Sequence, residues 1–84
     1  MNIYVGNLDF KVNEQELEKL FSEYGTVSSV KIITDKYSGR SKGFGFVEME
    51  EQDEAKKAIQ VLDGSSYGNR KMVVNEARPK KSNY

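Results

Sequence analysis

Residues 2–8 and 42–49 alternate two kinds of position in the two-residue period of a β-strand. In the second segment, one set of alternate positions carries Lys42, Phe44, Phe46 and Glu48. The intervening positions carry Gly43, Gly45, Val47 and Met49. Because burying a charge without a partner is very costly, the face with the lysine and the glutamate is predicted to meet solvent. Two phenylalanines are therefore expected on a solvent face, beside a cation.

The first segment has the same arrangement. Its aliphatic residues Ile3 and Val5 share one face, and Tyr4 lies on the other. If the two strands are neighbours with matching faces, Tyr4, Phe44 and Phe46 form one surface, which we call the aromatic platform. Burial is the commoner fate of an aromatic residue in a strand. Lys42 and Glu48 lie on the same face as the two phenylalanines, and their charges favour exposure of that face.

Two further segments have apolar residues at helical spacing. The first carries Leu17, Leu20, Phe21 and Tyr24, and the second carries Ala55, Ala58, Ile59 and Leu62. Asn13, followed three residues later by a glutamate, predicts the start of the first helix with a capping box. Gly25 and Gly64 are predicted to end the two helices.

Strands are also predicted over 27–34 and 71–77. Their inward residues are Val30, Ile32, Met72 and Val74, and their outward residues include Lys31, Ile33, Val73 and Asn75. The segment 65–70 between the second helix and the last strand is rich in turn residues. The order predicts an α+β, ferredoxin-like β-α-β-β-α-β fold, in which two helices cover one face of a four-stranded antiparallel sheet.

Charge is balanced overall but unevenly distributed. The chain has 13 basic and 13 acidic residues. The predicted helices, 13–24 and 50–63, hold nine of the acids and three of the bases, which leaves four acids and ten bases elsewhere. A neutral protein can thus present a basic face to a nucleic acid. The alternative is that the acidic helices are simply solvated.

The predicted loop 35–41 concentrates part of this basic charge. It contains Lys36, Tyr37 and Arg40, and Lys42 follows directly. One interpretation is an ordinary solvated hairpin tip. The other, which we favour, is a flexible basic segment that closes over a bound strand.

Several classes of function are excluded or disfavoured by composition. The chain contains no cysteine, so disulfides and thiolate metal sites are impossible. It contains no histidine either, which removes the commonest general base and the commonest metal ligand. No apolar run approaches the roughly 20 residues of a membrane span. A strand that begins at residue 2 leaves no room for a signal peptide. We expect a cytoplasmic protein without metal, cofactor or membrane partner.

Residues 3–8, Ile-Tyr-Val-Gly-Asn-Leu, resemble the six-residue RNP2 motif of the RNA recognition motif (RRM) family. Residues 42–49 resemble its eight-residue RNP1 motif, and seven of the eight positions fit. The departure is Met49, which faces inward and so concerns core packing. The resemblance extends over residues 1–78 and implies one RNA recognition motif, followed by a basic tail over residues 79–84.

The resemblance implies that single-stranded RNA is the partner, with single-stranded DNA bound more weakly. Tyr4 and Phe44 would each stack on a base, Phe46 would pack against riboses, and Lys42 would meet a phosphate. The remaining candidate residues are Lys31, Asn75 and Arg78, which would meet base edges or phosphates, and Arg40 and Ile33 near the same face. The chain also resembles the small single-domain bacterial members, so we expect a monomer that is not an enzyme.

Two alternatives use the same fold. Some family members bind a peptide on the helical side and lack the platform aromatics, whereas this chain has all three. Acylphosphatases hold phosphate with an arginine in the loop after the first strand, and the corresponding residues 6–11 contain no arginine.

Overall fold

The predicted β-α-β-β-α-β order is confirmed in a computed structural model that describes residues 1–68 and 70–77. The main elements are β1 (Asn2–Gly6), α1 (Glu14–Ser22), β2 (Val27–Thr34), β3 (Ser41–Met49), α2 (Gln52–Leu62) and β6 (Val73–Glu76). A short ribbon made of β4 (Ser66–Tyr67) and β5 (Arg70–Lys71) precedes β6. Within these described residues, neither helix is long and apolar enough to cross a membrane.

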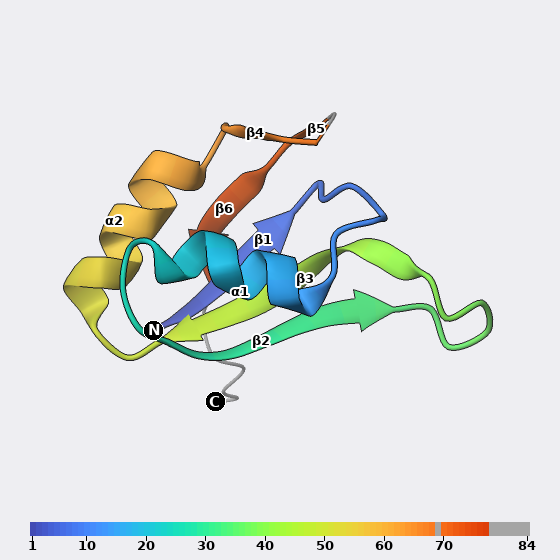
Figure 1. The fold of residues 1–84 in the computed structure, drawn as a ribbon, viewed down its shortest axis with the longest axis horizontal. Coiled ribbons are helices and arrows are strands. Elements are labelled where there is room, and N and C mark those ends of the chain that lie inside the picture. The colour runs from blue at the N-terminus through green and yellow to red at the C-terminus, as the bar shows by residue number, and fades with distance from the viewer. Residues whose placement is uncertain (69, 78–84) are drawn as a thin grey trace, which may run out of the picture.

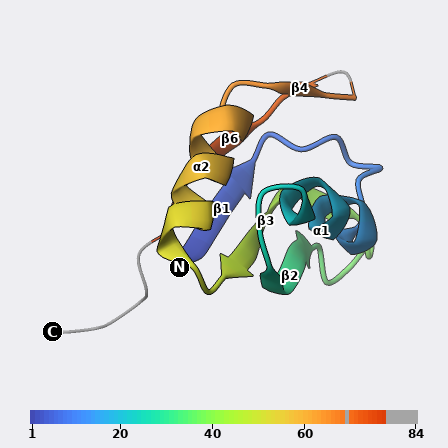
Figure 2. The same cartoon turned by 60° about the vertical axis from the view of Figure 1, so that its left-hand side comes forward.

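The four long strands form one antiparallel sheet in the order β2-β3-β1-β6. The two motif strands, β1 and β3, are therefore the central neighbours, with Tyr4 directly opposite Phe46. Both helices cover the same face of this sheet (Figure 1), and the rotated view shows α1 and α2 side by side in front of it (Figure 2). Among residues 1–68 and 70–77, no helix lies on the other face, which we call the outer face.

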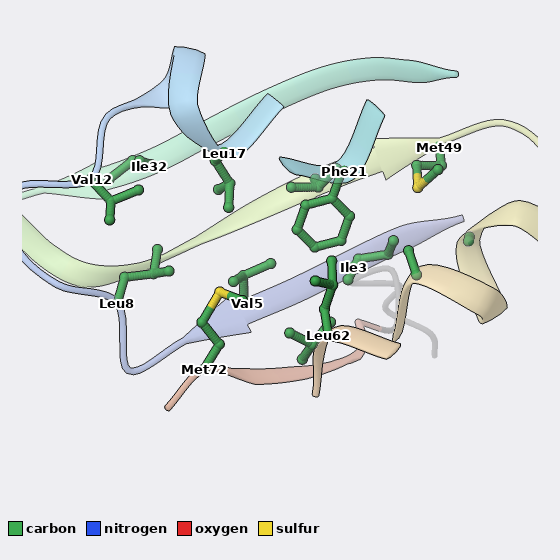
Figure 3. Packing of buried hydrophobic residues seen from close by; sticks show 14 residues of the cluster. Ile3, Val5, Leu8, Val12, Leu17, Phe21, Ile32, Met49, Leu62 and Met72 are labelled. Carbon is green, nitrogen blue, oxygen red and sulfur yellow. The ribbon is translucent and has the colours of Figure 1, made fainter. Parts of the chain in front are cut away.

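The core lies between the helices and the inner face of the sheet. Figure 3 shows Phe21 of α1 pointing toward Ile3 of β1, and both side chains are fully buried. The inward strand positions Val5, Val47 and Val74 are also fully buried, as the alternation predicted. The outer face is therefore free to carry side chains that the fold does not need for its core.

The helix boundaries follow the predicted signals with one exception. Asn13 caps α1, and its side chain accepts a hydrogen bond from the Glu16 backbone N–H at 2.8 Å, which completes the capping box. Gly64 follows α2 with a φ of +82°, as a helix-ending glycine does. The prediction for Gly25 is wrong, because α1 ends earlier, at a Glu23 cap. Gly25 instead leaves room for Glu54, with which a Cβ at this position would collide.

The region after α2 differs from the prediction. Residues 65–70 were expected to be a turn and 71–77 one strand, but Arg70 and Lys71 pair back onto Ser66 and Tyr67. A turn through Gly68, with a φ of +67°, makes this pairing possible. The ribbon ends at Met72, whose N–H donates to the Ser65 carbonyl at 2.8 Å, and β6 begins one residue later.

Each edge strand of the sheet donates a backbone hydrogen bond to a carboxylate near a helix end. The Ile32 N–H of β2 donates to Glu14 Oε2 in the first turn of α1, at 3.0 Å. The Val74 N–H of β6 donates to Asp63 Oδ1, which follows α2, also at 3.0 Å. The pairing of β2 with β3 is further interrupted by two register shifts, one at each end of β2.

Candidate nucleic-acid interface

One row of side chains crosses the outer face and takes one residue from each strand. Lys31 of β2 lies opposite Phe46 of β3, Phe46 lies opposite Tyr4 of β1, and Tyr4 lies opposite Asn75 of β6. Two aromatic rings thus have an ammonium group on one side and an amide on the other. The alternation of the sequence predicted the common face, and strand pairing supplies the common row.

The three rings of the aromatic platform pack against one another. Their centroids lie 5.9 Å apart for Tyr4 and Phe46, 6.1 Å for Tyr4 and Phe44, and 6.4 Å for Phe44 and Phe46. The two phenylalanine rings are perpendicular, at 90°. Because each ring covers part of the others, all three are half-buried rather than fully exposed. The platform is therefore a preassembled cluster whose remaining surface faces solvent.

Gly6 determines how the tyrosine lies. Tyr4 and Gly6 share the outer face of β1, and a Cβ built on Gly6 would lie 2.8 Å from two carbons of the Tyr4 ring. Such a distance is shorter than any ordinary contact, so the ring occupies the space that a side chain at position 6 would need. The absence of that side chain lets the tyrosine lie along the strand.

The outer face changes character along the strands. On one side of the platform, Ser29 and Asn2 both lie opposite Glu48, which gives a polar row with a carboxylate. On the other side, Val73 lies opposite Gly6 and is 41% exposed. Val73 was predicted to point outward but was not included among the site residues. Its position extends the apolar surface next to Tyr4.

We call the end of the sheet where β1 stops and β3 begins the loop end. Three connections lie at this end, namely the β1–α1 loop, the β2–β3 loop and the β4–β5 ribbon (Figure 1). Their exposed bases, with that of the adjoining strand β3, are Lys11, Lys36, Arg40, Lys42, Arg70 and Lys71. The opposite end carries Glu48, Glu50, Glu51 and Glu76. The sequence predicted that charge separates between helices and strands. Among the described residues, the structure adds a separation along the strands, because these six basic residues outnumber Asp9 and Asp35 in the same loops and the four glutamates lie at the other end.

The other predicted site residues occupy different surroundings. Lys42 is exposed on β3, two residues before Phe44. Ile33 lies within a register shift between β2 and β3 and is half-buried. Arg40 is exposed in the β2–β3 loop, where its carbonyl accepts a hydrogen bond from the Asp35 N–H at 2.8 Å. Arg78 lies outside the described residues.

The β2–β3 loop has an organised backbone. The N–H of Gly39 donates to the Asp35 carbonyl, and the N–H of Tyr37 donates to Asp35 Oδ1, both at 2.8 Å. The Tyr37 ring at its tip is 96% exposed. The expectation that this loop closes over a bound strand stays a prediction.

The sequence model of the RNA recognition motif family matches residues 3–73. The chain belongs to this family. The RRM is similar to a protein of Nostoc sp. named for RNA binding, RbpE, with 51% identity over 95% of this chain and 81% of the relative. Among solved structures, it is similar to an RNA-binding protein named PG1, with 48% identity, a TM-score of 0.92, and 98% and 99% of the two chains covered. It is also similar to the Sex-lethal protein in a complex with RNA, with 31% identity, a TM-score of 0.89, and 95% and 48% covered.

Family membership confirms the α+β, ferredoxin-like fold, and the relatives named as RNA-binding proteins confirm the prediction that the chain is not an enzyme. The acylphosphatase alternative is thereby rejected. The domain boundary at residue 78 and the separate tail over 79–84 stay predictions.

Proposed function

We propose that this RRM binds single-stranded RNA on the outer face of its sheet and acts in post-transcriptional control. The observation that carries the proposal is the clustering of Tyr4, Phe44 and Phe46, with ring centroids 5.9–6.4 Å apart, on the outer face. Aromatic rings on such a sheet stack two or three unpaired bases. Family relatives named for RNA binding, and a solved complex of one relative with RNA, support this proposal.

Each predicted site residue on or near the outer face has a chemical role in this proposal. Tyr4 and Phe44 stack on successive bases, and Phe46 packs against the riboses between them. Lys31, beside Phe46, supplies a cation for phosphate. Asn75, beside Tyr4, carries both a donor and an acceptor, which suits hydrogen bonding to a base edge. Lys42 and Arg40 meet further phosphates, and Ile33 adds apolar contact.

The charges along the outer face favour one end of the sheet as the place where the RNA backbone leaves the platform. A phosphate near Glu48 is repelled, whereas one near Lys42 is attracted. The strand should therefore cross the platform and leave toward the loop end. We propose that Arg78 and the basic tail meet further phosphates.

The remaining expectations concern the context of binding. Single-stranded DNA should bind more weakly, because it lacks the 2′-hydroxyl group that RNA-binding proteins use. We propose that the domain acts as a monomer. We further propose a cytoplasmic location, since its relatives with high identity are bacterial proteins.

The proposal is tested by two double substitutions on the platform. Phe44→Ala with Phe46→Ala removes both rings, and each lost base stack lowers the binding free energy by about 1–3 kcal/mol. We expect single-stranded RNA to bind at least about tenfold more weakly in fluorescence anisotropy. Because the rings also contact each other, the alanine variant should lose some stability as well.

Phe44→Leu with Phe46→Leu separates these two effects. Leucine keeps much of the apolar volume but has no flat face, so the variant should remain folded and still lose binding. The matched control is Val61→Ala on α2, which removes an exposed apolar side chain from the helical side. Folded leucine and alanine variants that bind RNA with unchanged affinity would overturn the proposal. A loss of binding with Val61→Ala alone would place the site on the helices.

A further inference from the structure

Phe10 is an exposed aromatic residue on an ordered loop. Its side chain is 59% exposed, although its loop neighbours Leu8 and Val12 are buried. The loop is fixed to the sheet, because the Leu8 N–H donates to the Gly43 carbonyl at 2.8 Å. It is also closed internally, since the Val12 N–H donates to the Asp9 carbonyl at 3.0 Å. The fold therefore holds a large apolar ring in solvent without using it in the core.

A guanidinium group lies over this ring. Arg70 of β5 has its Cζ 5.2 Å from the centroid of the Phe10 ring. Its Nη1 donates to Asn7 Oδ1 at 3.0 Å, and Asn7 Nδ2 in turn donates to the Lys71 carbonyl at 2.7 Å. Asn7 thus links the β1–α1 loop to the β4–β5 ribbon. Since Asn7 is neutral, this bond positions the guanidinium without neutralising its charge.

The pair lies at the loop end, where Phe10 contacts the strand that carries Phe44 and Phe46. Gly43 immediately precedes Phe44, and a Cβ built on Gly43 would lie 3.3 Å from Cε1 of Phe10. Gly43 has a φ of +87°, so glycine suits both the backbone bend and the close approach of the ring. An RNA strand that leaves the platform toward the loop end and turns over the end of the sheet would reach this position.

We propose that Phe10 and Arg70 form an accessory subsite that takes one further base of the single-stranded RNA, beyond those held by the platform. This inference rests on the proposed function. Bases stack on aromatic rings and on guanidinium planes, and the pair offers one of each. Arg70 also brings a positive charge to the phosphate that joins this nucleotide to the platform. The subsite lengthens the bound segment at the loop end without requiring a particular base.

The test compares two lengths of RNA. An oligouridylate of about three nucleotides fills the platform alone, and one of about eight nucleotides also reaches the accessory subsite. We expect Phe10→Ala to weaken binding of the longer RNA about fivefold or more, as the loss of one stack implies. Binding of the shorter RNA should not change.

Arg70→Lys provides a second variant on a different element. Lysine keeps the charge but lacks the planar group, so affinity for the longer RNA should again fall. The slope of log affinity against log salt should stay the same, because no phosphate contact is removed. Val61→Ala serves as the matched control, and melting curves verify that each variant is folded.

The outcomes distinguish the two proposals. Wild-type protein that binds both RNAs, with folded Phe10→Ala and Arg70→Lys variants that bind the longer one normally, overturns the accessory subsite and leaves the platform intact. Equal losses for the short and the long RNA also overturn it, because they indicate an indirect effect on the platform. Wild-type protein that binds neither RNA overturns the proposed function and the subsite together.

Discussion

Replacing Gly6 by alanine tests the orientation of the Tyr4 ring, because the substitution moves the ring without removing it. The new Cβ would lie 2.8 Å from two carbons of the Tyr4 ring. Carbon atoms without a bond between them rest about 3.5–4.0 Å apart, so the ring must shift by roughly 1 Å. That shift changes the packing of the tyrosine ring against Phe46, which lies directly opposite, and so changes the surface on which a base would stack.

The expected effects on binding and on stability differ. Loss of one stack weakens binding by about 1–3 kcal/mol, and a shifted ring should lose the lower part of this range, roughly five- to tenfold in affinity. Alanine is favoured over glycine within a strand by about 0.5–1 kcal/mol, which offsets the strain of moving a half-exposed ring. Gly6 does not have a positive φ, so the backbone accepts alanine. The melting temperature should therefore change by less than about 4 °C.

A double-mutant cycle checks the mechanism. Affinity for one single-stranded RNA is measured by anisotropy for wild type, Gly6→Ala, Tyr4→Ala and the combined variant. If alanine at position 6 acts through the tyrosine ring, it should have no further effect once the ring is absent. Wild-type affinity in Gly6→Ala would refute the reasoning. A loss that persists undiminished in the Tyr4→Ala background would refute it as well.

Three more predictions concern the proposed mode of binding. Single-stranded RNA should bind much more tightly than the same sequence annealed to its complement, because a flat sheet cannot stack bases inside a duplex; equal affinities in a filter assay would contradict stacking. If three or four lysine or arginine side chains meet phosphates, a plot of log affinity against log salt should have a slope of roughly −2 to −3. An affinity that does not change with salt would show that these side chains do not contact the RNA. Deleting residues 79–84, which removes Lys80 and Lys81, should make that slope shallower while the sheet still binds; loss of all binding with the fold intact would place the main contacts outside the sheet.

Alternation and spacing predicted the parts of the fold that depend on one local period. Phe44 and Phe46 could be assigned to the face of Lys42 because parity in a strand needs no knowledge of the partner strand. The β2 boundaries, Val27–Thr34, were predicted correctly for the same reason. Asn13 and Gly64 were recognised because caps depend on a few neighbouring residues.

The remaining features depend on contacts between distant residues. Residues 71–77 alternate like one strand, but Arg70 and Lys71 turn back through Gly68 onto Ser66 and Tyr67, and alternation does not report pairing. The accessory pair was missed for a similar reason. In the sequence, Phe10 is a single aromatic residue between Asp9 and Lys11, and the cation that lies over it comes from 60 residues away, on β5.

The carboxylates of Glu14 and Asp63 affect whether copies of this domain can associate through the edges of their sheets. A sheet edge with free N–H groups invites another strand to pair with it, and this is a common route to aggregation. Here a donor on β2 and a donor on β6 are each occupied by a side chain from the helical layer. The irregular register of β2 further disfavours a straight partner strand. Both edges are thus poor templates for a strand from another copy of the domain, so the sheet can leave its flat outer face uncovered without inviting edge-to-edge association.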